Sequence, residues 1–376
     1  MNKTIFIAGS GGIGEAAALL LREWCDFETT IILGDINEAN LAKAKSFVTE
    51  GSAKTTAVET VLMPKDGLDD ALKAAFERAD VLLDCSPGGQ APRMAGYAVD
   101  FKMHYANLTE YVAETDAIIE LAKDAETGFV LQTGLAPGFI NVLAMQLYQQ
   151  FVASYGAEHV ERIAMKVGAL TANAHAPHFY GFTWSPIGVA TEYVKNARVV
   201  REGKITEVAP LTDRETIIIG AKPYEADLTS GGAADLPDFL EGKVNALDYK
   251  TIRYPGHYAW VESVRNSLPN DENLPTVLEK IMLEQIPSVE DDQVLVHASV
   301  DGFDEKGRRR MNEKAYLIEP LKINGKSLRA IQTTTAAPLC ESAMMLLTDK
   351  YKGVLLQSKI EPGEFIGGKF VQNVYK

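Results

Sequence analysis

The stretch Thr-Ile-Phe-Ile-Ala-Gly-Ser-Gly-Gly-Ile-Gly, residues 4–14, decides the fold of the first domain. An apolar run of strand character leads into three spaced glycines, and an alanine- and leucine-rich helical pattern follows at once. In a dinucleotide-binding βαβ unit, the first glycine allows a tight turn, the second lets the backbone approach the pyrophosphate, and the third lets helix and strand pack closely. The helix N-terminus then faces the phosphates. We therefore expect a dinucleotide-binding turn made of Gly9, Ser10, Gly11, Gly12, Ile13 and Gly14.

A lone glycine pattern also fits a turn in an ordinary α/β domain, and the second predicted strand distinguishes the two cases. The segment Ile31-Ile32-Leu33-Gly34-Asp35 ends in an acid about 20 residues beyond the glycines, where NAD proteins bind the ribose 2′-hydroxyl. Asp35 would repel a 2′-phosphate, and its neighbours Ile36 and Asn37 bring no guanidinium. The sequence therefore predicts NAD as the cofactor and disfavours NADP.

The composition is that of an ordinary globular protein. The 376 residues are 46% hydrophobic and 23% charged, and the chain is long enough for two domains with separate cores. A net charge of −14 argues against nucleic acid and anionic membrane surfaces as partners. The three cysteines are isolated, no signal-peptide pattern opens the chain, and no apolar run is long enough to span a bilayer. We therefore expect a soluble cytoplasmic protein.

The order of apolar and helical patterns predicts an α/β protein with two domains. Residues 1–137 alternate six short apolar runs with helical patterns, which is typical of a Rossmann doubly wound parallel sheet. Residues 138–328 begin with a long helix and continue with strand-like segments, so we expect an inserted α+β substrate domain with a mostly antiparallel sheet. Residues 329–376 contain a capped apolar helix that we expect to return to the first domain.

Ligands of an open parallel sheet bind beyond the carboxyl ends of its strands, so the loops after the last three predicted strands matter most. The further expected cofactor contacts are Ile36, Cys85, Ser86, Pro87, Thr109, Leu135, Ala136 and Pro137. Glu110 is the one carboxylate in these loops, which makes it a candidate catalytic base. Its alternative role is a favourable negative charge at the start of the following helix.

Two stretches of the second domain combine turn residues with polar side chains. One is Thr229-Ser230-Gly231-Gly232, and the other is Arg253-Tyr254-Pro255-Gly256-His257. A guanidinium and an imidazole four residues apart could bind a carboxylate and move a proton, although the same residues also suit a structural turn. The expected substrate contacts are Arg253, Tyr254, Thr229, Ser230, Gly231 and Trp184, with His257 as a catalytic candidate.

A third cluster contains His175 and His178, shortly before Trp184. Two histidines spaced in this way bind zinc only with further ligands, and no third ligand lies nearby in the sequence. We therefore predict no metal site.

The motifs together, in their order along the chain, resemble the saccharopine dehydrogenase-like family, and within it the bacterial lysine 6-dehydrogenases. The resemblance rests on GSGGIG, Asp35, GLAPGF (134–139), TSGG (229–232), EGKV (241–244), TIRYPGH (251–257) and IQTTTAA (331–337). It implies a Rossmann domain, an inserted domain that supplies a homodimer or larger homo-oligomer interface, and NAD-dependent oxidation at an amine-bearing carbon. The match is weakest over residues 172–181, which makes this segment a candidate specificity region.

The resemblance also implies a reaction. L-Lysine would be oxidatively deaminated at its ε-carbon to the 6-semialdehyde, with its α-carboxylate on Arg253 and with His257 or Glu110 as the base. The alternatives within the family are a saccharopine or carboxynorspermidine dehydrogenase, which would take an amino acid or a polyamine and could use NADPH. An alternative of another class is a catalytically silent NAD-binding protein.

Overall fold

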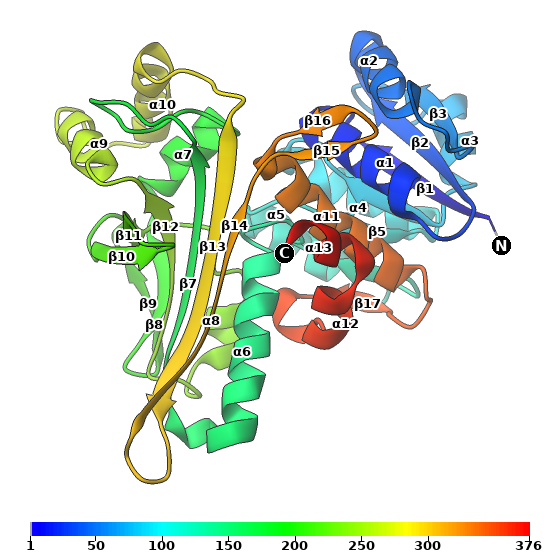
Figure 1. Cartoon of the computed structure of the whole chain (residues 1–376). Helices are drawn as coiled ribbons and strands as arrows, with labels where there is room; N and C mark the ends of the chain where they lie inside the picture. Colours follow the sequence, from blue (N-terminus) through cyan, green and yellow to red (C-terminus); the bar gives the residue numbers. More distant parts are fainter. Residues whose placement is uncertain (1) are drawn as a thin grey trace. The chain divides into compact units, whose positions relative to one another are not determined.

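A parallel sheet organises the first unit of the chain (Figure 1). The computed structural model describes residues 2–376, apart from the side chain of Ala157. Within these residues the sheet has seven strands in the order β17-β6-β5-β4-β1-β2-β3, and all neighbouring pairs are parallel. The strands are β1 (Lys3–Ala8), β2 (Thr29–Asp35), β3 (Ala57–Leu62), β4 (Val81–Asp84), β5 (His104–Asn107), β6 (Gly128–Val130) and β17 (Gly353–Leu355).

The strand order is that of a doubly wound dinucleotide-binding sheet. From β1 the chain moves outward through β2 and β3 on one side and through β4, β5 and β6 on the other. The sequence predicted six strands, and the structure adds β17, which comes from the far end of the chain and pairs with β6. The predicted Rossmann architecture is therefore confirmed, with one strand more than expected.

Helices cover both faces of this sheet, which explains the continuous apolar runs of its strands. On β1, Phe6 joins a core cluster with Met94 and Ile118, whereas Ile5 and Ile7 point to the opposite face and are also fully buried. The helices between the strands are α1 (Gly12–Trp24), α2 (Glu38–Thr49), α3 (Asp70–Phe76), α4 (Ala91–Asp100) and α5 (Val112–Leu121), with a short 3-10 helix, η1 (Gly88–Gln90), before α4.

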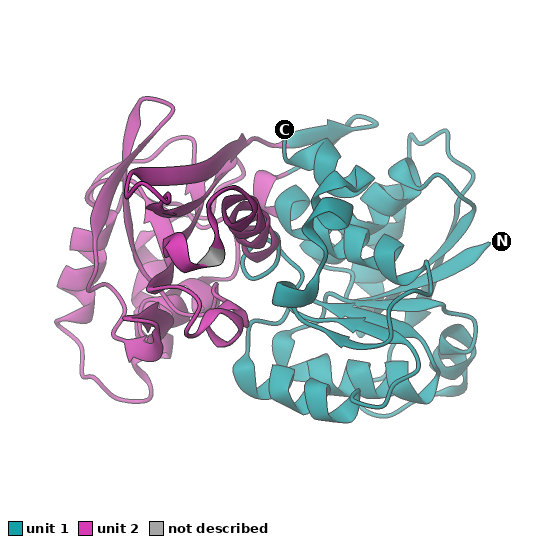
Figure 2. Cartoon of the chain, turned by 90° about the horizontal axis from the view of Figure 1, so that it is seen from below, with its two compact units in different colours: residues 1–139, 321–328, 332–376 teal, residues 140–320, 329–331 magenta. Residues whose placement is uncertain are grey.

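The chain divides into two compact units, which Figure 2 colours separately. Unit 1 comprises Met1–Phe139, Leu321–Leu328 and Gln332–Lys376, and unit 2 comprises Ile140–Pro320 and Arg329–Ile331. Met1, the first residue of the expected first domain, lies outside the described residues.

The C-terminal part of unit 1 packs against the loop that follows β6. The ring of Tyr375 stacks on Phe139 with centroids 3.5 Å apart, and its hydroxyl donates a hydrogen bond to the carbonyl of Thr334 (2.6 Å). This part contains the hairpin of β15 (Leu321–Ile323) and β16 (Lys326–Leu328), then α11 (Ala330–Leu346), whose first two residues are assigned to unit 2, and η3 (Gln357–Lys359), α12 (Pro362–Gly367) and α13 (Lys369–Val374).

Unit 2 is built on a mixed sheet of eight strands within the described residues. The main path is β10-β11-β12-β7-β13-β14, and β8 pairs with both β12 and β9. Only the β7–β12 pair is parallel, so the expected mostly antiparallel sheet is confirmed. The strands are β7 (Val160–Thr171), β8 (Ala197–Arg201), β9 (Lys204–Val208), β10 (Glu215–Ile219), β11 (Lys222–Leu228), β12 (Ala246–Arg253), β13 (Asp292–Phe303) and β14 (Arg309–Ile318).

The helices of unit 2 enclose a second, largely aromatic core. Tyr180, Tyr193, Tyr258 and Leu278 belong to one buried cluster, which joins the segment after β7 to three helices. The helices and 3-10 turns of this unit are α6 (Phe139–Tyr155), which begins at the last residue of the first segment of unit 1, η2 (Ala157–His159), α7 (Pro186–Glu192), α8 (Leu236–Leu240), α9 (His257–Arg265) and α10 (Leu274–Gln285).

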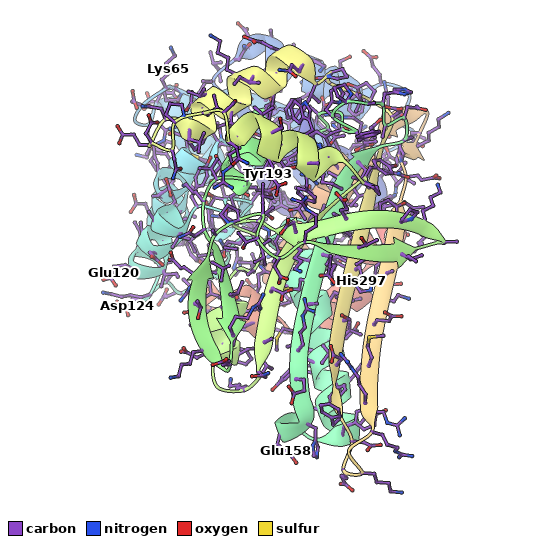
Figure 3. The ribbon with its side chains drawn as sticks, turned by 90° about the vertical axis from the view of Figure 1, so that its left-hand side faces the viewer. Lys65, Glu120, Asp124, Glu158, Tyr193 and His297 are labelled. Carbon is purple, nitrogen blue, oxygen red and sulfur yellow. The ribbon has the colours of Figure 1, made fainter. Side chains whose placement is uncertain are left out.

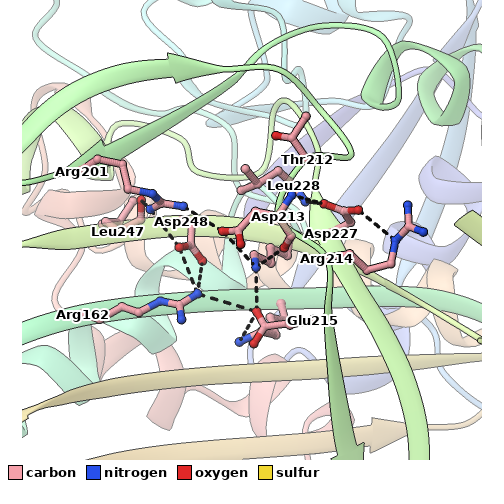
Figure 4. A network of polar contacts seen from close by, with 12 residues as sticks. Arg162, Arg201, Thr212, Asp213, Arg214, Glu215, Asp227, Leu228, Leu247 and Asp248 are labelled. Carbon is pink, nitrogen blue, oxygen red and sulfur yellow. Dashed lines mark hydrogen bonds and ion pairs between the residues drawn. The ribbon is translucent and has the colours of Figure 1, made fainter. Parts of the chain in front are cut away.

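A network of ion pairs lies on one face of the unit 2 sheet (Figure 4). Asp248, only 1% exposed at its side chain, accepts from Arg162 and Arg201 at 3.0 Å each. The Nζ of Lys250, 2% exposed, lies 2.9 Å from Glu215 and 3.3 Å from Asp213. Each of these buried charges therefore has a partner of opposite sign within the chain. We call these residues, together with Lys166, the sheet ion network.

Among residues 2–376, no helix combines the length and the apolar character that a membrane span requires.

Candidate functional site

The turn after β1 is shaped by contacts that exclude larger side chains. Gly9 has a φ of +90°, and a Cβ placed on it would lie 2.7 Å from the carbonyl oxygen of Cys85. A Cβ on Gly14 would lie 1.9 Å from the oxygen of Gly9, so helix and turn meet there with no room for a side chain. At Gly11, the N-cap of α1, a Cβ would meet no described atom within 4 Å. The turn thus packs tightly on its inner side and leaves space at the helix N-terminus, as a phosphate-binding turn requires.

Asp35, the last residue of β2, is tied directly to this turn. Its Oδ2 accepts hydrogen bonds from the backbone nitrogen (2.8 Å) and hydroxyl (2.9 Å) of Ser10, and its Oδ1 accepts from the nitrogen of Asn37 (2.9 Å). The next side chain, Ile36, is 56% exposed. The carboxylate is therefore fixed beside the glycine turn, at the position predicted for the ribose contact.

The loops after β4, β5 and β6 lie along the same edge of the sheet. A Cβ on Gly88 would lie 2.7 Å from the Oγ1 of Thr109, which shows how closely the first two loops approach. Ser86 donates its backbone N–H to Asp84 (3.0 Å), whose carboxyl pKa is raised by burial. Glu110 is half-buried immediately after Thr109, just before α5.

The third loop, residues 133–139, closes on itself. The nitrogen of Gly134 donates to the oxygen of Pro137 (3.0 Å), and the nitrogen of Phe139 donates to the oxygen of Gly134 (2.8 Å). Leu135 is buried within this loop, between Gly134 and the expected cofactor contacts Ala136 and Pro137.

Gln332 contacts the glycine turn and was not expected from the sequence. Its Nε2 donates to the carbonyl oxygen of Gly12 at 2.9 Å, which joins α11 to the start of α1. The residue lies in the IQTTTAA motif, which was the only signal that could have identified it.

The second group of candidate residues centres on Arg253, the last residue of β12. Its side chain is 1% exposed. Its Nε donates to the hydroxyl of Tyr193 (2.7 Å), its Nη1 donates to the oxygen of Ile252 (2.9 Å), and the guanidinium lies over the ring of Tyr180 (4.8 Å). The Nη2 makes no hydrogen bond with any described residue, and Glu192 Oε2 lies 4.0 Å away from it.

His257, the first residue of α9, is fully buried beside this arginine. Its Nδ1 lies 2.6 Å from the carbonyl oxygen of His178, and its Nε2 lies 3.0 Å from the hydroxyl of Tyr193, the residue labelled in Figure 3. Since a carbonyl oxygen only accepts, Nδ1 carries the proton and Nε2 accepts from Tyr193. Burial and the neighbouring Arg253 lower the pKa of His257 to about 3. The imidazole is therefore neutral, and both of its nitrogens are engaged.

The structure brings only some of the expected substrate residues near Arg253. Ser230 donates its N–H to the oxygen of Glu192 (3.3 Å), and Trp184 packs against the aromatic core that contains Tyr180 and Tyr193. The expected contacts Thr229 and Gly231 flank Ser230 in the same loop.

Tyr254, one of the expected substrate contacts, points elsewhere. The hydroxyl of Tyr254 donates to the oxygen of Thr171 (3.0 Å) and accepts from Gln293 (2.5 Å), so it is held by β7 and β13 of the unit 2 sheet. His175 is exposed. In the described part of the chain, no group of three or more His, Cys, Asp or Glu side chains is arranged to hold a metal ion.

No sequence pattern indicated Tyr193, Tyr180 or Glu192, although all three surround Arg253. They lie near α7 and in the segment after β7, and reach the arginine only through folding of the aromatic core. No turn signal or motif marks them.

Family models match almost the whole chain. Residues 5–131 match the saccharopine dehydrogenase NADP binding domain, and residues 134–368 match the saccharopine dehydrogenase C-terminal domain. The mitochondrial alpha-aminoadipic semialdehyde synthase of Rattus norvegicus is 29% identical over 212 residues, which are 55% of this chain and only 21% of that protein. Unit 1 is therefore a nicotinamide-dinucleotide-binding unit.

Solved structures show the same fold. Saccharopine dehydrogenase (L-Glu forming) from Saccharomyces cerevisiae has a TM-score of 0.75 at 14% identity, over 99% of this chain and 98% of that one. The homospermidine synthase of Legionella pneumophila, solved with NAD, has a TM-score of 0.68 at 12% identity, over 100% of this chain and 91% of that one. With both domain models matched in order, the chain belongs to the saccharopine dehydrogenase family.

Proposed function

We propose that the protein is an NAD-dependent oxidoreductase that acts on a carbon–nitrogen bond of an amino acid, most specifically the ε-amine of L-lysine. The observation that carries the proposal is the guanidinium of Arg253, which is buried with its Nη2 lacking a hydrogen bond to any described residue. A buried charge is costly unless it is paired. A substrate carboxylate supplies the missing acceptor.

Glu192 narrows the class of substrate. Its carboxylate lies 4.0 Å from the Nη2 of Arg253, which is within electrostatic range but beyond hydrogen-bonding distance. A cation and an anion at this spacing complement the carboxylate and ammonium of an α-amino acid. A polyamine lacks the carboxylate, so this pair favours amino acids over the polyamine alternative.

The residues of unit 1 fit the cofactor. The open space beside Gly11 suits a pyrophosphate at the N-terminus of α1, and the fixed carboxylate of Asp35 suits ribose hydroxyls. A nicotinamide dinucleotide would accept a hydride from the amine-bearing carbon, which turns the amine into an imine. Hydrolysis of this imine releases ammonia and the 6-semialdehyde. We propose NAD because Asp35 and exposed Ile36 provide no positive charge for a 2′-phosphate.

The burial of His257 changes the expected assignment of the base. With a pKa of about 3 and both nitrogens engaged, this imidazole is a poor acceptor for the proton of an ammonium group. We therefore assign His257 a positioning role and keep Glu110 as the candidate base. The ε-amine of lysine has a pKa of about 10.4. Because only the neutral amine can release hydride from its carbon, the rate should rise with pH up to that range. A constant rate between about pH 7 and pH 10 would contradict this proposal.

Appearance of reduced cofactor is the direct test. Purified protein is assayed with NAD or NADP at about pH 7 and about pH 9.5, with L-lysine, saccharopine, L-ornithine and polyamines. We expect oxidation of lysine with NAD. Oxidation of saccharopine alone would favour the family alternative, and cofactor binding without turnover would favour a silent NAD-binding protein. A homodimer, which the resemblance implies, remains part of the proposal and is tested by the mass in solution.

The role of Asp35 has its own test. Replacing Asp35 with Ser and Ile36 with Arg removes the negative charge and adds a guanidinium, so we expect the preference to move toward NADP by roughly tenfold or more. An unchanged ratio of kcat/KM for the two cofactors would show that Asp35 does not lie at the ribose.

A further inference from the structure

A chain of hydrogen bonds extends from Arg253 to the segment after β7. The Nε of Arg253 donates to the Oη of Tyr193 at 2.7 Å, and the same oxygen lies 3.0 Å from the Nε2 of His257. The Nδ1 of His257 lies 2.6 Å from the oxygen of His178. Arg253, Tyr193 and His257 are each 1% exposed or less.

The direction of these bonds is fixed by chemistry. The guanidinium at one end can only donate, and the carbonyl of His178 at the other end can only accept. The Tyr193 hydroxyl and the His257 imidazole, which lie between these ends, must therefore each accept one hydrogen bond and donate the next. We call this chain of hydrogen bonds the relay. The hydroxyl of Tyr193 accepts from Arg253 and donates to His257, and His257 donates to His178. Every donor in this chain of hydrogen bonds meets an acceptor only when the imidazole is neutral and carries its proton on Nδ1.

We propose that Tyr193 and His257 are positioning residues that orient the guanidinium of Arg253 for a substrate carboxylate. The relay occupies Nε, the carbonyl of Ile252 occupies Nη1, and Nη2 is left as the donor that points to the ligand. This inference rests on the proposed role of Arg253 and adds Tyr193, which no motif marked.

The relay also connects substrate binding to residues 172–181, the segment named above as a candidate specificity region. His178 lies within residues 172–181. The ring of the next residue, Phe179, packs against Gly256, the residue before His257, so closely that a Cβ on Gly256 would lie 2.9 Å from it. A shift of this segment would move His257, then Tyr193, and then the guanidinium. Changes in the segment can therefore alter carboxylate recognition without a direct contact to the substrate.

Tyr193→Phe tests the relay because it keeps the ring and removes both hydrogen bonds. Tyr258→Phe is the matched control, since it removes another buried hydroxyl of the same core, which donates to the oxygen of Thr251. We expect Tyr193→Phe to raise the KM for lysine by about 10- to 100-fold, as expected for loss of a hydrogen bond to a charged group. The KM for NAD and the kcat/KM for 1,5-diaminopentane, which lacks the carboxylate, should stay within about threefold of the wild type.

A second readout does not depend on turnover. Nitrogen-15 NMR of histidine-labelled full-length protein should show His257 neutral, protonated on Nδ1, with an Nε2 resonance that shifts in Tyr193→Phe and not in Tyr258→Phe. The relay would be wrong if His257 were cationic near neutral pH or protonated on Nε2. It would also be wrong if the Nε2 resonance had the same position in Tyr193→Phe as in the wild type. If no amino acid is oxidised, the proposed function fails while the NMR result still decides the relay. If lysine is oxidised and its KM is unchanged in Tyr193→Phe, the positioning role is wrong.

Discussion

Two groups of cations in unit 2 differ in how the chain pairs them. In the sheet ion network, Lys250 has carboxylates at 2.9 and 3.3 Å, and Arg162 and Arg201 share Asp248 at 3.0 Å. Around Arg253, the direct partners are the hydroxyl of Tyr193 and a backbone carbonyl, and the carboxylate of Glu192 lies 4.0 Å away. The side chains of Lys250 and Arg253 are equally buried, at 2% and 1% exposure.

This difference separates a structural charge from a binding one. Burial alone would raise the pKa of Asp248, yet Arg162 and Arg201 outweigh it and hold that pKa below its usual range. The network is thus satisfied within the folded chain. The Nη2 donor of Arg253 has no hydrogen-bond acceptor among the described residues, which costs stability in the free protein. The burial of this donor becomes favourable when an anion binds to it. Proteins commonly accept such a cost at sites where they bind ligands.

The largest expected effect concerns activity. Arg253→Met removes the proposed carboxylate partner, and we expect kcat/KM for the amino acid to fall by roughly 100- to 1000-fold, with the KM for NAD little changed. Lys250→Met removes an equally buried cation from the sheet ion network and should leave kcat/KM within about threefold. Steady-state kinetics of the two variants checks this pattern, and similar losses in both would remove the distinction between the two groups.

Stability should show the opposite order. Lys250→Met leaves the carboxylates of Glu215 and Asp213 with less compensation, so we expect the free energy of unfolding to fall by about 3 kcal/mol. Arg253→Met removes a cation with an unfilled donor and should cost less, about 1 kcal/mol, because an apolar side chain suits the aromatic core. Urea unfolding gives both values. A larger loss for Arg253→Met would mean that its charge is better paired than the structure indicates.

The smallest effect concerns acid stability. The pKa values of Asp248 and Glu215 are lowered in the folded state, because nearby cations outweigh their burial. Their stabilisation is therefore present above the unfolded carboxyl pKa values, about 4, and is lost as the pH falls through the lower folded values. Asp248→Asn should destabilise the protein by about 1–2 kcal/mol near neutral pH and by less near pH 3. A difference from wild type that is the same at both pH values would contradict this assignment.

The sequence predicted most where the decisive features are local. The glycines of residues 9–14 and Asp35 stand at fixed spacings along a βαβ unit, and the Rossmann sheet that they predict is present. The three-residue strand β17 was missed, because its pairing with β6 joins segments more than two hundred residues apart, and no local pattern records such a contact.

The surroundings of Arg253 show the same limit at the level of single side chains. The turn of residues 253–257 identified Arg253 and His257, since both lie on one short segment. Burial, which decides the pKa of His257, is a property of the folded core and cannot be read from that segment. Glu192 is the last residue of α7 and Tyr193 follows it, about sixty residues before Arg253 in the sequence. Only the packing of the folded core brings these two residues to Arg253.

The central claim, that Arg253 holds the carboxylate of the substrate, is tested most directly by comparing L-lysine with 1,5-diaminopentane. The measurement is the ratio of their kcat/KM values in the wild type and in Arg253→Met. We expect a strong preference for lysine in the wild type that falls to near unity in the variant, because only lysine offers a carboxylate to the guanidinium. An unchanged preference for lysine in Arg253→Met would show that the carboxylate is bound elsewhere and that Arg253 does not hold it.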